Sequence, residues 1–111
     1  MRVFVSCPYG KRKGLPQAEI EANVQTAIEA GKELARRGHS PFVPHLYHYL
    51  VTGEISEDRW LEITLEWLSV CQGMLMIGDW VNSFGARHEW NAAMRDGKQI
   101  FYRIEEVPHA T

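Results

Sequence analysis

The sequence predicts an α/β fold: a three-layer, doubly wound parallel sheet of about four to five strands, of the Rossmann-like and flavodoxin-like kind. Two observations predict it. Short apolar runs alternate with longer segments whose apolar residues recur at helical spacing, so successive strands are joined by helices and run parallel. One run, residues 74–77, is apolar throughout, which is typical of a central strand covered on both faces. We expect one domain over residues 1–111.

The first half of the chain is predicted to form a strand, a helix and a second strand. Residues 3–6 are a short apolar strand that ends in a Cys-Pro-Tyr-Gly turn. Residues 16–37 have helical periodicity, and Gly38 follows as a left-handed cap. Residues 41–43 are a short strand, expected at a sheet edge because proline flanks it on both sides. Residues 44–56, rich in aromatic residues and histidine, are predicted to form a loop.

A second helix is predicted to begin after Ser56, whose hydroxyl can cap it. Its apolar face is unusually wide, so this helix is either well buried or packs on another subunit. The face comprises Trp60, Leu61, Ile63, Leu65, Trp67, Leu68 and Cys71.

The last third of the chain is predicted to be strand, loop, helix and strand. The strand at residues 74–77 leads into a polar loop at 78–84. A third helix over about 85–95 ends before Gly97, and residues 99–102 are the last strand. A weak tail of about one helical turn follows.

Charge and composition argue against several classes of function. The net charge is −2 and the one basic run, residues 11–13, is too short to hold a polyanion, so we expect no nucleic-acid polymer as partner. Cys7 and Cys71 are too few for a disulfide framework. The apolar runs are too short to span a membrane, and Met1 and Arg2 lead directly into a strand rather than a signal peptide. We therefore expect a cytoplasmic protein without a membrane partner.

Three loops are expected to meet at one edge of the sheet. In open parallel sheets, ligands bind beyond the carboxyl ends of the strands, at the topological switch point. The loops at residues 6–13, 44–56 and 78–85 converge there if the fold is as predicted. We therefore expect the functional residues to lie in these loops.

Glu89 is the strongest candidate for a reactive group. It is expected in about the first turn of the third helix, four residues after Gly85, and facing the crevice. Because a helix N-terminus stabilises negative charge, we expect this carboxylate to stay ionised and to act as a nucleophile or an electrostatic stabiliser. A glutamate near a helix start is also common for dipole reasons alone.

The turn after the first strand is a candidate anion site. Its backbone can cradle an anion, and Lys11 with its basic neighbours can add charge, although the turn is neither a P-loop nor a dinucleotide motif. Cys7 and Arg12 are one residue short of the spacing in a cysteine phosphatase loop, and Cys7 is more simply a small residue at a strand end. The residues of the turn are Ser6, Cys7, Pro8, Tyr9 and Gly10.

The other two loops supply further candidates. His45 and His48 have a spacing that could bind a metal, and a metal-dependent hydrolase that also uses Glu89 is one alternative. No cysteine pair or dense acid cluster accompanies them, so we favour His45 as a pocket-lining residue and expect neither metal nor cofactor.

The loop before the third helix carries four more candidates: Asp79, Trp80, Ser83 and Gly85. Ser83 could cap the helix or present its hydroxyl to a phosphate or a sugar. Trp80 could stack on a base or pack at an interface.

These features together resemble the nucleoside 2-deoxyribosyltransferase-like superfamily, near its deoxynucleoside monophosphate N-glycosidase branch. The resemblance is carried by the stretch GDWVNSFGARHE at residues 78–89, by Ala92-Ala93, and by the Gly97-Lys98 turn into the last strand. Asn23, Gly38 and the Pro-Phe-Val-Pro-His segment resemble small members of the group. The match extends over nearly the whole chain.

The resemblance implies an enzyme that cleaves the N-glycosidic bond of a nucleoside or nucleoside monophosphate. Glu89 would attack the anomeric carbon to form a covalent deoxyribosyl-enzyme, which water or a second base would resolve. Ser83 matches a position that is Ser in the monophosphate hydrolase branch, where it contacts phosphate. Sites in the superfamily are often completed by a neighbouring subunit, so a homodimer or higher homo-oligomer is expected.

Three departures from the family pattern leave a second function open. Thr64 replaces an Asp that assists catalysis, Gln72 replaces a later acid, and Phe4 replaces a Tyr. Glu62 or Glu66 could substitute for the missing Asp only out of register, and His45 or His88 could protonate the leaving group. The alternative is a catalytically silent nucleotide-binding or sensing module.

Overall fold

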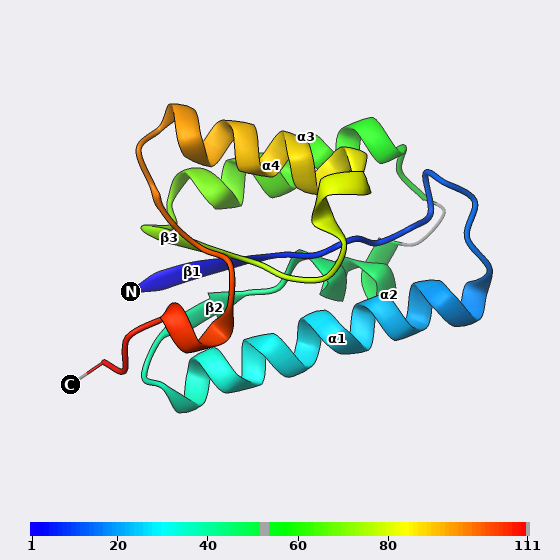
Figure 1. Cartoon of the computed structure of the whole chain (residues 1–111). Coiled ribbons are helices and arrows are strands. Elements are labelled where there is room, and N and C mark those ends of the chain that lie inside the picture. The colour runs from blue at the N-terminus through cyan, green and yellow to red at the C-terminus, as the bar shows by residue number, and fades with distance from the viewer. Residues whose placement is uncertain (52–53, 111) are drawn as a thin grey trace.

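A four-stranded parallel sheet forms the centre of the structure, in the order β2-β1-β3-β4 (Figure 1). This computed structural model describes residues 1–51 and 54–110. Each neighbouring pair of strands is parallel, and Val5, for example, lies opposite Leu75. The predicted parallel α/β sheet is thus confirmed, with the proline-flanked strand at an edge. The strands are β1 (Arg2–Ser6), β2 (Ser40–Phe42), β3 (Gly73–Met76) and β4 (Gln99–Phe101).

Helices cover both faces of this sheet. The long helix α1 (Gln17–Arg36) lies on one face, and α3 (Glu57–Ser69) and α4 (Phe84–Arg95) lie together on the other (Figure 1). The short helix α2 (His48–Val51) follows β2 on the side of α1. This is the three-layer arrangement that the alternating strands and helices predict.

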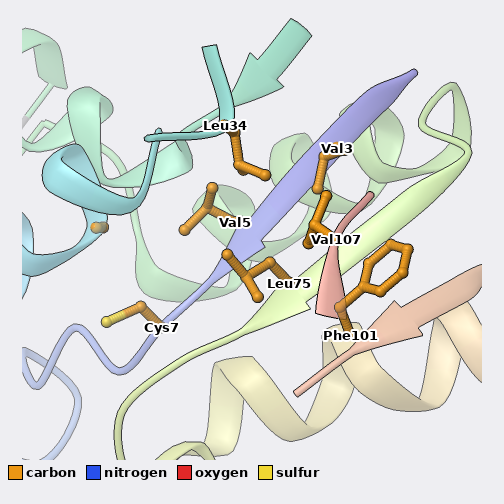
Figure 2. Close-up of a cluster of buried hydrophobic side chains, with 8 residues drawn as sticks. Val3, Val5, Cys7, Leu34, Leu75, Phe101 and Val107 are labelled. Atoms are coloured by element: carbon orange, nitrogen blue, oxygen red, sulfur yellow. The ribbon is translucent and has the colours of Figure 1, made fainter. Parts of the chain in front are cut away.

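Side chains of β1 alternate between the two faces and so enter two separate cores. Val3 and Val5 pack with Leu34 of α1 in the cluster that Figure 2 shows, together with Leu75. Phe4 points the other way and belongs to a cluster under α3 and α4. Because β1 and β3 are buried on both faces, each must be apolar along almost its whole length.

The ends of the helices follow the predicted capping chemistry. Gly38 has a φ of 89°, in the left-handed region, just after α1. Ser56 accepts a hydrogen bond from the Arg59 amide at 3.1 Å and so caps α3. Ser83 accepts one from the Ala86 amide at 3.3 Å and so caps α4.

The prediction of a loop over residues 44–56 was wrong for the first half of that range. It contains a 3₁₀ turn at Pro44–Tyr47 and then α2, because His48 is held by tertiary contacts that the local pattern does not reveal. Residues 52 and 53 of that prediction, and residue 111 of the predicted tail, lie outside the described residues. The tail does form one helical turn, at Ile104–Glu106.

The wide apolar face of α3 is only partly covered within one chain. Leu68 is buried, whereas Trp67 is 46 % exposed and lies against Phe42 of the edge strand with ring centroids 5.3 Å apart. Within residues 1–51 and 54–110, no helix combines the length and apolar character needed to cross a bilayer.

Candidate active site

A cavity of about 470 Å³ opens beyond the carboxyl ends of β1 and β3. Its walls come from the three loops that the fold class predicts to converge, and its size is typical of a small-molecule site. All but two of the predicted site residues line it; the exceptions are Ser6 and Trp80. Those that line it are Cys7, Pro8, Tyr9, Gly10, Lys11, His45, Asp79, Ser83, Gly85 and Glu89.

The carboxyl group of Glu89 is held in the cavity wall by two hydroxyl groups. Ser6, at the end of β1, donates a hydrogen bond to Oε1 at 2.8 Å. The hydroxyl of Thr64 in α3 lies 3.4 Å from Oε2 and 3.0 Å from the Leu61 carbonyl oxygen, so these two acceptors share its one proton. Glu89 is only 7 % exposed, so few orientations are open to it. The two bonds fix the carboxyl group at a wall of the cavity.

The charge state of Glu89 differs from the prediction. Burial raises the pKa of Glu89 to about 7. The hydrogen bonds from Ser6 and Thr64 lower this pKa, but their effect is smaller than that of burial. The expectation that it stays ionised at a helix N-terminus was wrong for two reasons. Glu89 is the sixth residue of α4 rather than in its first turn, where the helix dipole acts most strongly, and it is almost completely desolvated. Near neutral pH both protonation states are therefore populated.

Ser6 and Thr64 support the carboxyl group of Glu89 from behind the cavity. Ser6 was predicted to contact substrate, but its side chain is completely buried and does not line the cavity. Thr64 of α3 does not line the cavity either, and its hydroxyl lies 3.4 Å from Oε2 of Glu89.

The other replaced positions lie away from the cavity. Gln72 lies at the amino end of β3, where its side chain accepts a hydrogen bond from the Arg2 amide at 2.7 Å. Phe4 is in the core. Glu62 and Glu66 line a separate groove between α3 and α4, so neither can take the place of the missing Asp.

Trp80 does not reach the cavity. Its ring stacks on Trp90, with centroids 5.7 Å apart, and lies 6.1 Å from Tyr102. The aromatic side chains that line the cavity include Tyr9, Trp60 of α3 and Phe84 of α4. Trp60 was predicted only as part of the apolar face of its helix. Its place in the first turn of α3, at the ligand end of the sheet, is the signal that identifies it as a wall residue.

A basic strap, which we define as Lys11, Arg12 and Lys13, lines the mouth of the cavity. It runs between Gly10 and Gly14, whose φ values of 103° and 72° lie in the left-handed region. The guanidinium of Arg12 lies 2.9 Å from a carboxylate oxygen of Asp58 and 4.3 Å from the ring centroid of Phe84. The strap thus places positive charge beside the N-terminal ends of α3 and α4.

The two histidines of the H-x-x-H pair are each held by protein groups. His45 lines the cavity, donates from Nε2 to the Pro8 carbonyl at 3.2 Å, and has its pKa lowered chiefly by burial. His48 is not a cavity residue; its ring nitrogens bond to Tyr9 and Glu21. No three His, Cys, Asp or Glu side chains among the described residues are placed to hold a metal ion. The geometry therefore does not support the alternative of a metal-dependent hydrolase.

Cys7 is expected to react slowly with thiol reagents. Burial, together with the neighbouring Glu89, raises its pKa to about 12, so almost no thiolate is present at pH 8. We expect alkylation by iodoacetamide to be at least ~100-fold slower than that of free cysteine. Mass spectrometry of a Cys71→Ser variant would measure it, and modification at the free-cysteine rate would reinstate Cys7 as a candidate nucleophile.

Residues 1–103 match the family described as Domain of unknown function (DUF7768), and the chain belongs to that family. All the cavity-lining residues fall within the matched range. The cavity is therefore part of the family's own domain. The search of curated proteins gives no match to this chain.

Proposed function

We propose that this DUF7768 domain cleaves the N-glycosidic bond of a nucleoside or nucleoside monophosphate, with Glu89 as the nucleophile. The observation that carries the proposal is a buried carboxyl group fixed at the wall of a ligand-sized cavity. A group with these properties is suited to covalent catalysis, because its orientation is set before substrate arrives.

The chemistry requires the ionised form of Glu89. One carboxylate oxygen attacks the anomeric carbon, the C–N bond breaks, and its electron pair leaves with the base, which takes up a proton. Ser6 and Thr64 orient the carboxylate through their hydroxyl groups. Water or a second base then attacks the same carbon and releases Glu89. Because the pKa of Glu89 is about 7, the nucleophile is present in useful amounts at neutral pH.

The remaining walls of the cavity suit a nucleotide. The basic strap supplies charge for a phosphate group, and Ser83 lines the cavity while its oxygen caps α4. A hydroxyl that accepts from a helix amide can still donate its proton to a phosphate oxygen. The rings of Tyr9 and Trp60, which stack on each other, line the cavity and give a base an aromatic wall to pack against.

The test is to incubate the protein with a panel of 2′-deoxynucleosides and their 5′-monophosphates and to follow free base by chromatography. We expect release from at least one member of the panel, with the monophosphates preferred. Absence of release from every member would refute the proposal.

A nucleotide-binding module without turnover is the second candidate, favoured by Thr64. A threonine hydroxyl cannot supply the acid that the family pattern has at that position. In this case monophosphates would stabilise the fold, by about 2.7 kcal/mol at a hundredfold excess over Kd, and no base would appear.

We also propose that the protein is cytoplasmic and that it forms a homo-oligomer. Trp67 on the apolar face of α3 is 46 % exposed, and Val70, directly after the helix, is 51 % exposed. A second copy packed there would bury this apolar surface. Light scattering at micromolar concentration should then give at least a dimer, and a strict monomer would contradict it.

A further inference from the structure

A second polar chain, separate from Glu89, begins at the cavity wall. The hydroxyl of Tyr9 is hydrogen-bonded to Nδ1 of His48, and Nε2 of His48 donates to Oε1 of Glu21 at 2.8 Å. The three residues come from the loop after β1, from α2 and from α1. No step proposed above uses them.

This chain connects the cavity with solvent. Tyr9 lines the cavity, with its ring stacked on Trp60 at 5.3 Å between centroids. His48 is 7 % exposed, and the side chain of Glu21 is 43 % exposed. His48 thus joins a residue of the cavity wall to a carboxylate that is exposed to solvent.

The carboxylate of Glu21 determines which ring nitrogen of His48 faces Tyr9. The hydrogen bonds from His48 and then Gln17 lower the pKa of Glu21, so Glu21 is ionised and accepts from Nε2 of His48. The other ring nitrogen, Nδ1, is then the one that faces the Tyr9 hydroxyl. The arrangement holds the imidazole ring in one orientation between an anion and a phenol.

The other candidates for protonating a leaving base are less well placed. His45 lines the cavity, but its Nε2 proton is donated to the Pro8 carbonyl and burial keeps the ring neutral. His88 does not line the cavity and packs on Phe84, with ring centroids 4.3 Å apart. Thr64 does not line the cavity, and its hydroxyl lies between the Leu61 carbonyl and Glu89.

We propose that Tyr9, His48 and Glu21 form a proton relay that protonates the leaving base. This inference rests on the proposed glycosidic cleavage. As the C–N bond breaks, Tyr9 gives its hydroxyl proton to the base nitrogen that receives the electron pair. Tyr9 takes a proton from Nδ1 of the His48 imidazolium, which leaves neutral His48 beside the Glu21 carboxylate. Solvent at Glu21 then returns one proton to His48, and the relay is reset.

The test compares two leaving groups on the same sugar. A nucleobase must be protonated as it departs, whereas 4-nitrophenolate leaves readily as an anion. We expect Tyr9→Phe to slow base release by about 10²-fold or more and to leave release of 4-nitrophenolate within about threefold of wild type. Tyr49→Phe is the matched control: its hydroxyl lies 3.4 Å from the same Glu21 but outside the cavity lining, and both rates should stay unchanged.

Equal losses with both leaving groups, or no loss with either, would overturn the relay and leave Glu89 as the proposed nucleophile. Failure of the wild-type protein to release either leaving group would instead overturn the proposed function, and the relay with it. Should Tyr9→Phe not fold, Glu21→Gln keeps an acceptor for Nε2 of His48 but removes the carboxylate that takes up protons from solvent, and it does not alter the cavity wall. The same selective loss of base release is expected from that variant.

Discussion

Glu89→Gln is expected to lower the rate of base release by at least about 10³-fold. Glutamine has the shape of glutamate, and its amide oxygen can accept the hydrogen bond that Ser6 now donates. What the variant loses is the anionic oxygen that forms the bond to the anomeric carbon. The fold and the cavity should therefore survive while the covalent step does not.

The measurement is single-turnover base release at pH 8, where the wild-type carboxylate is mostly ionised. Mass spectrometry of quenched wild-type protein should show a deoxyribosyl adduct on the peptide that contains Glu89. Glu66→Gln is the matched control, because Glu66 faces the groove between α3 and α4 and should keep the wild-type rate. Base release by Glu89→Gln at the wild-type rate would remove Glu89 from the mechanism.

The rate of base release by the wild-type protein should also increase with pH. The nucleophile is the ionised carboxylate, so on the acid side of the profile the rate should rise as pH increases through about 7. If Glu89 titrated with the ordinary pKa of a glutamate, the rise in rate would lie near pH 4.5 instead.

The fold could be predicted because its signals are local. The runs that form β1 and β3 are apolar along their length, since helices cover both faces of the sheet. Ser56 and Ser83 identify the starts of α3 and α4, because a hydroxyl at that position satisfies a helix amide. The order of the elements then places the cavity at the carboxyl edge of the sheet.

The support of Glu89 could not be predicted, because it depends on contacts between distant parts of the chain. Ser6 and Glu89 are separated by 83 residues, and nothing in the sequence near either shows that they meet. The same is true of α2, whose first residue, His48, is held by Tyr9 and Glu21. The orientation of Trp80 was decided by packing on Trp90 rather than by the loop that contains it.

Burial of Glu89 should also make the stability of the fold depend on pH. The pKa is about 7 in the folded chain and about 4.5 when the carboxyl group is free in solution. Between these values the folded protein binds more protons than the unfolded chain, so the free energy of unfolding falls as pH rises. The difference corresponds to about 3 kcal/mol, at 1.36 kcal/mol for each pKa unit.

Glu89→Gln should therefore raise the free energy of unfolding by about 3 kcal/mol at pH 8.5 and change it little at pH 4, where the wild-type carboxyl group is protonated in the folded chain and mostly protonated in the unfolded chain. Urea denaturation of both proteins at both pH values gives the comparison, and the many other titrating groups cancel in the difference. An effect that is the same at both pH values would mean that Glu89 ionises as easily in the fold as in water. Ionisation of Glu89 would then not lower the stability of the wild-type fold. The case for a functional Glu89 would be weaker, because an unfavourable buried charge persists in a protein where it serves a reaction.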